Sequence, residues 1–76
     1  MSEWHLFIGR KFTGIVVRPD GKYPDMYRVH RPGRPISDMV NLARAKDAAL
    51  AFAHIGGGVD FYWDRRQTPS EGALVA

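Results

Sequence analysis

Three short segments in the first half of the chain have the residue pattern of β-strands. They are residues 4–8, 12–18 and 26–30 (WHLFI, FTGIVVR and MYRVH). The first two are rich in aromatic and β-branched side chains, and the third alternates hydrophobic and polar positions. Residues 9–11 favour a tight turn, and residues 19–21 (PDG) favour a second one. The pattern predicts three antiparallel strands.

A helical period follows in the second half. Five hydrophobic residues recur on one helical face: Leu42, Ala45, Ala49, Phe52 and Ala53. This spacing predicts a helix over residues 42–54. Either Ser37 or Asn41 can cap its start, and we favour Asn41, which leaves residues 36–40 free to pair with the third strand.

The glycines at residues 56–58 predict the end of this helix. His54 is then expected in its last turn, where a positive charge is favourable. Residues 59–63 (VDFYW) alternate loosely, so they form either an additional C-terminal strand or an aromatic segment folded over the sheet. From Asp64 onward the chain is polar without a period. We therefore expect one domain over residues 1–63 and a flexible tail over residues 64–76.

The order of these elements predicts an α+β fold: a small two-layer domain with a three-stranded antiparallel sheet followed by one helix (β-β-β-α). One helix can cover only one face of the sheet. Alternation assigns to the covered face Trp4, Leu6, Ile8, Thr13, Ile15, Val17, Tyr27 and Val29. A slip of one residue would reverse the assignment of the second strand.

The helix-free face is expected to mix aromatic and basic side chains, and we interpret it as the functional surface. The residues predicted for a protein interface are Phe7, Phe12, Val16, Arg28 and His30. Such a surface fits a small non-enzymatic binding or regulatory module that binds a protein or a second copy of itself. A face simply covered by residues 61–63 is the other structural interpretation.

Charge adds an alternative function. The net charge is +3, and the first 36 residues hold seven of the eleven basic side chains but only three acidic ones. A basic half permits a polyanionic partner. The residues predicted for nucleic-acid binding are Arg18, Lys22, Arg28, Arg31 and Arg34. The helix carries few basic residues, so a helix that reads the major groove is not expected.

Catalytic and metal-binding patterns are weak. With no cysteine, the chain has no disulfide, no thiolate metal site and no cysteine nucleophile. The histidines (His5, His30 and His54) lack ligand spacing, and no phosphate-binding glycine motif occurs. We predict no enzyme, no cofactor, no metal, no small-molecule substrate and no membrane span, and a cytoplasmic location. The last four residues, ALVA, resemble the small apolar endings that bacterial proteases recognise.

Overall fold

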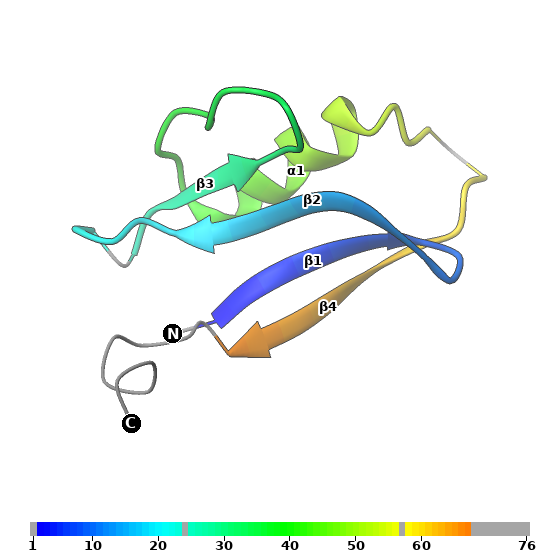
Figure 1. Cartoon of the computed structure of the whole chain (residues 1–76), viewed down its shortest axis with the longest axis horizontal. Coiled ribbons are helices and arrows are strands. Elements are labelled where there is room, and N and C mark those ends of the chain that lie inside the picture. The colour runs from blue at the N-terminus through cyan, green and yellow to red at the C-terminus, as the bar shows by residue number, and fades with distance from the viewer. Residues whose placement is uncertain (1, 24, 57, 68–76) are drawn as a thin grey trace.

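The computed structural model of the chain describes residues 2–23, 25–56 and 58–67, which form four strands and one helix (Figure 1). The strands are β1 (Ser2–Ile8), β2 (Lys11–Pro19), β3 (Tyr27–His30) and β4 (Phe61–Gln67). Helix α1 (Leu42–Phe52) lies between β3 and β4 in the sequence. All neighbouring strands pair antiparallel in the order β3-β2-β1-β4. The predicted α+β fold is confirmed, with the additional C-terminal strand present.

Strands β1 and β2 form a hairpin with a bulge. Phe7 pairs with Phe12 and His5 with Val16, so the single residue Leu6 lies opposite residues 13–15. The Thr13 hydroxyl fills the bulge: it donates to the Leu6 carbonyl at 2.8 Å and accepts from the Ile15 amide at 3.1 Å. Because the excess is an even number of residues, side chains before and after the bulge keep the same alternation.

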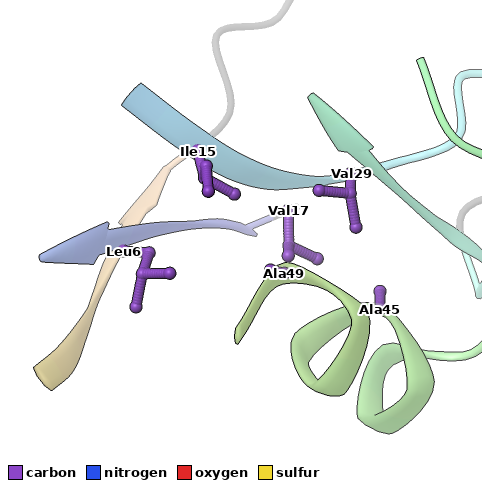
Figure 2. Close-up of a cluster of buried hydrophobic side chains, with 6 residues drawn as sticks. All are labelled: Leu6, Ile15, Val17, Val29, Ala45 and Ala49. Atoms are coloured by element: carbon purple, nitrogen blue, oxygen red, sulfur yellow. The ribbon is translucent and has the colours of Figure 1, made fainter. Parts of the chain in front are cut away.

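The predicted facing is therefore confirmed for Trp4, Leu6, Ile15, Val17, Tyr27 and Val29. Leu6, Ile15, Val17 and Val29 extend from β1, β2 and β3 toward Ala45 and Ala49 of α1, and all six are buried (Figure 2). The alanines of α1 let the helix approach the sheet closely. This cluster is the hydrophobic core. Partly buried aromatic residues, among them Trp4 and Trp63, pack against it.

The connection between β2 and β3 is longer than the tight turn expected at residues 19–21. Pro19 is the last residue of β2, and the Asp20 amide donates to the Met26 carbonyl at 2.8 Å. The Asp20 carboxylate accepts from the amides of Lys22 and Tyr23 at 3.1 and 3.0 Å. Asp20 therefore organises a loop by bonding the backbone that follows it.

The helix begins as predicted and ends earlier. The Arg44 amide donates to the Asn41 side chain at 2.8 Å, so Asn41 is the N-cap. Of residues 36–40, Val40 alone bridges Tyr27, so no strand forms there within the described residues. The predicted end at the glycines is wrong. His54 lies after the helix in the left-handed region (φ 56°), and its amide donates to the Ala51 carbonyl at 3.1 Å.

The Ile55 amide donates to the Leu50 carbonyl at 3.1 Å, which completes a Schellman motif with His54 at the left-handed position. Ile55 then packs against the core. This contact explains why the chain turns at His54 rather than at the glycines. His54 is not in the last turn, contrary to the prediction.

Strand β4 pairs with β1 along its whole length, from Phe61 opposite Ile8 to Gln67 opposite Ser2. Residues 61–63 therefore extend the sheet sideways and do not cover its face. The strand passes the predicted domain boundary by four residues, through Gln67. Residues 68–76, with the ALVA ending, lie outside the described part of the chain. No helix of the described residues is long and apolar enough to cross a membrane.

Candidate functional site

The residues predicted for a protein interface lie together on the face of the sheet that α1 leaves uncovered. Phe7 pairs with Phe12, Val16 pairs with His30, and Arg28 lies opposite Arg18. We call this surface the helix-free face. Its members from the four strands are Glu3, His5, Phe7, Phe12, Val16, Arg18, Arg28, His30, Tyr62, Asp64 and Arg66.

Four rings cross this face from β2 over β1 to β4, and we call them the aromatic strip. The Phe12 ring lies 5.4 Å from the His5 ring and 5.3 Å from the Phe7 ring, measured between centroids. The Phe7 ring stacks on Tyr62 at 5.0 Å with an interplanar angle of 7°. Spacings of this kind are favourable for aromatic pairs, so the four rings form one continuous aromatic surface.

The two outer rings of the strip are open to solvent. Phe12 is 42% exposed and Tyr62 is 49% exposed, whereas Phe7 and His5 between them are half-buried. The inner rings therefore hold the outer rings in place while the outer rings present area to a partner. Exposed aromatic side chains at fixed positions are typical of interface anchors.

The charged residues of this face are largely paired with one another. Glu3 is buried (7% exposed). Its Oε2 atom lies 2.8 Å from Arg18 Nε, and its Oε1 atom lies 3.0 Å from His5 Nε2. Burial acts to raise the pKa of Glu3, but the hydrogen bond from His5 and the charge of Arg18 outweigh it, so the pKa lies below its usual value. Glu3 is therefore a buried carboxylate held in its ionised form.

Two more arginine side chains of this face are paired with carboxylates. Arg28 Nε donates to Asp20 at 3.0 Å, and its Nη1 donates to the Ser37 carbonyl at 3.0 Å. The hydrogen bond from Arg28 lowers the pKa of Asp20, helped by the backbone amide of Tyr23. Arg66 Nε lies 2.8 Å from the Asp64 carboxylate. Three arginines of the face thus have carboxylate partners, and its charge is close to balanced.

His30 lies beside this charged region, opposite the buried Val16. Partial burial lowers the pKa of His30, and the neighbouring charges of Arg18 and Arg28 lower it further. The neutral imidazole is therefore the favoured form in the folded protein. His30 contributes a polar but uncharged group to the predicted interface.

The residues predicted for nucleic-acid binding are not gathered into one patch. Arg18 and Arg28 are neighbours, but both are engaged with carboxylates. Lys22 lies in the β2–β3 loop, 5.6 Å from the Tyr23 ring. Arg31 and Arg34 line a separate pocket. These five residues are therefore distributed over three parts of the surface: the helix-free face, the β2–β3 loop and the pocket.

The sequence analysis missed the members of the face that come from β4 and the role of Glu3. Tyr62 completes the aromatic strip, and Asp64 and Arg66 form an ion pair beyond it. The sequence does allow this prediction: if residues 61–66 form a strand, residues 62, 64 and 66 share one face and residues 61, 63 and 65 share the other. The polar composition after Trp63 concealed it. The importance of Glu3 depends on the β1–β2 register, which places Arg18 beside it.

Within the described residues, no three histidine or acidic side chains lie close enough together to hold a metal ion. Comparison of the chain with protein-family models, curated proteins and solved structures gave no match.

Proposed function

We propose that this protein is a small non-enzymatic binding module that self-associates through its helix-free face. The observation that carries the proposal is the aromatic strip, with Phe12 and Tyr62 exposed at its ends. Removing two such rings from water on each copy is a substantial driving force for association. The proposal places the protein in the cytoplasm, in line with a chain that has no cysteine.

The charge of the face supports a second copy as the partner. Arg18, Arg28 and Arg66 are matched by Glu3, Asp20 and Asp64 on the same surface. Two copies can therefore face each other about a two-fold axis without like charges accumulating. A strongly basic face would have repelled its copy and favoured a polyanion.

The small core is a further argument for self-association. Helix α1 packs against β2 and β3, and only seven hydrophobic residues of the described chain are buried. A domain of this size buries little of its surface on folding. A second sheet packed on the helix-free face would add apolar contact to the exposed rings Phe12 and Tyr62.

Light scattering after size exclusion, at low and at high salt, tests this proposal. We expect a dimer that survives high salt, because apolar contacts are strengthened rather than screened. The double variant Phe12→Ser/Tyr62→Ser should be a folded monomer. The matched control, Tyr23→Ser/Ile36→Ser, removes two exposed hydrophobic residues outside the strip (50% and 56% exposed) and should remain a dimer. A wild-type monomer at both salts would contradict the proposal.

Nucleic-acid binding remains the alternative prediction, and the same preparation tests it. Phosphate contacts by Arg18 or Arg28 would have to compete with the carboxylates that already hold these side chains. Titration with short single-stranded DNA and RNA would show binding that weakens steeply with salt if phosphates are contacted. Such binding, together with a monomeric protein, would replace self-association as the function.

A further inference from the structure

A pocket lies at the edge of β2, at a distance from the charged part of the helix-free face. Strand β3 pairs only with the last residues of β2, from Val16 to Pro19, so residues 11–15 have no described partner on that side. The loop after β3 and the end of α1 enclose the space beside them. The pocket is open to solvent, has a volume of about 590 Å³ and includes residues of β1, β2, α1 and this loop.

The charged and ring-nitrogen groups around this pocket are basic. They are Lys11, Arg31, Arg34 and His54, and none of the described lining residues is acidic. The remaining polar side chain, Thr13, already donates to the Leu6 carbonyl and accepts from the Ile15 amide. The ion pairs of the described residues include none of the three cationic side chains. The pocket therefore offers hydrogen-bond donors and positive charge without a matching acceptor.

Arg31 shows this imbalance most clearly. Its guanidinium carbon lies 3.8 Å from the centroid of the Phe52 ring, which holds the side chain against α1. Its Nε atom is buried and has no hydrogen-bond partner among the described residues. A buried donor without an acceptor is unfavourable, so the Arg31 side chain has unused hydrogen-bonding capacity beside this pocket.

The rest of the lining is apolar and comes from separate elements. It consists of Ile8, Phe12, Ile15, Pro32, Phe52 and Ala53. A pocket with apolar walls and a few convergent polar groups is the usual form of a small-molecule site, and this volume is in the usual range. Sequence reasoning did not find it, because its cations come from different strands, loops and helix ends.

The pocket is held in shape by local backbone geometry. Gly14 has φ +85°, and a Cβ atom at this position would lie 2.6 Å from Pro32 Cγ. The loop is therefore packed directly on the bulge of β2. The Arg34 amide donates to the Arg31 carbonyl at 3.3 Å, which closes a turn between the two arginines. A preformed site of this kind loses little entropy when a ligand binds.

We propose that this pocket binds a small amphipathic anion, with its carboxylate or phosphate on Lys11, Arg31 and Arg34 and its apolar body against Phe12, Ile15 and Phe52. Guanidinium groups bind both kinds of head group by paired hydrogen bonds. The site shares Phe12 with the proposed self-association surface, but its cations Lys11, Arg31 and Arg34 lie outside that surface. Variants of these cations therefore test the pocket separately from the aromatic strip.

The test is a titration of ¹⁵N-labelled protein, followed by NMR, with octanoate, octyl phosphate and octan-1-ol. We expect saturable shifts of the Gly14, Gly33 and His54 amides with one or both anions, and much weaker binding of the neutral alcohol. Binding of octanoate alone identifies a carboxylate site, and binding of octyl phosphate alone identifies a phosphate site. Absence of saturable shifts with both anions, or equal binding of the alcohol, would overturn the proposal.

Two double variants separate a site from general positive charge. Lys11→Gln/Arg34→Gln removes two exposed cations of the pocket and should weaken anion binding by about tenfold or more. Lys22→Gln/Arg44→Gln removes the same charge at exposed positions outside the pocket and should bind like wild type. Equal loss in both variants would mean that the anion responds only to net charge, and the proposal would fail. Circular dichroism confirms that each variant is folded.

Discussion

The two faces of this sheet reach burial in different ways. On the face covered by α1, Leu6, Val17 and Val29 are completely buried beneath alanines of the helix. On the helix-free face, Glu3 and Val16 are also buried (7% and 6% exposed), although none of the described elements lies over them. One face is buried by a second layer, and the other by its own neighbouring side chains.

This difference shows how a small domain can use the charges of an uncovered face. Ion pairs and stacked rings extend sideways across the strands, with Arg18 covering Glu3 and Phe12 covering His5. The charged and aromatic side chains of this face therefore pack on one another and shield the residues beneath them from solvent. The exposed ends of the aromatic strip are what remains available to a partner.

The sharpest test of the comparison uses adjacent residues of β1. Leu6→Ala should lower the free energy of unfolding by about 3 kcal/mol, because it removes a completely buried side chain and leaves a cavity. Phe7→Ala, on the helix-free face, should cost the monomer about 1 kcal/mol, since the half-buried ring loses its stacking on Tyr62. Urea denaturation of both variants measures the difference. Equal costs would mean that the faces are packed alike.

The second test concerns the bulge that keeps both faces in phase. Gly14→Ala should lower the free energy of unfolding by about 2–3 kcal/mol. The backbone is left-handed at this position, and the new Cβ atom would lie only 2.6 Å from Pro32 Cγ. Gly9→Ala is the matched control: its φ is +58°, but nothing lies within 4 Å of the added methyl group. It should cost about 1 kcal/mol in the same denaturation experiment. A Gly14 variant no worse than the control would show that Pro32 yields easily.

The third test removes the buried carboxylate of the helix-free face. Glu3→Gln should cost about 1 kcal/mol at pH 7, because the pairing with Arg18 and the hydrogen bond with His5 weaken. Asp47→Asn, at an exposed position of α1, should change little.

The same pair of variants tests the pH dependence. Because the pKa of folded Glu3 lies below its usual value of 4.5, its contribution is present above that pH and is lost as the pH falls through the folded pKa. Stability of the wild type should therefore decrease more steeply in acid than that of Glu3→Gln. Parallel curves would show that Glu3 adds nothing to acid sensitivity.

The smallest expected effect comes from His30. Its folded pKa lies below the usual 6.5, so below that pH the unfolded chain binds a proton more readily, and stability falls as the pH drops toward the folded pKa. His30→Gln should leave stability at pH 7 within about 0.5 kcal/mol and reduce the loss between neutral and mildly acidic pH. Thermal unfolding across this range measures both. An unchanged slope would contradict the lowered pKa that burial, with the charges of Arg18 and Arg28, gives to His30.

Strand composition, turn residues and alternation were enough to predict three of the four strands, whereas the fourth was only one of two alternatives. The helix pattern located α1 and its cap at Asn41. The bulge at residues 13–15 could not be predicted, since a glycine in a strand does not reveal how many residues it adds. The facing of β2 was right because the excess is even.

Long-range contacts decided the features that the sequence did not reveal. The helix ends at Phe52 and the chain turns at His54, because Ile55 reaches the core from there, although three glycines follow. The β4 residues Asp64 to Gln67 look like a polar tail until they are placed beside β1. The strand register decides which arginines lie beside a carboxylate. The residues of the candidate face could therefore be predicted, but its ion pairs and its net charge could not.

The pairing of β1 with β4 has a consequence for synthesis on the ribosome. Strand β1 is translated first, yet one of its two edges is completed only by residues 61–67, the last described part of the chain. From the time β1 emerges from the ribosome until residues 61–67 are available, the nascent chain presents an open edge of β1 beside Trp4 and Leu6. Open hydrophobic edges promote association between nascent chains, so slow elongation before Phe61 favours aggregation or chaperone binding. The completed sheet forms only after β4 has left the exit tunnel.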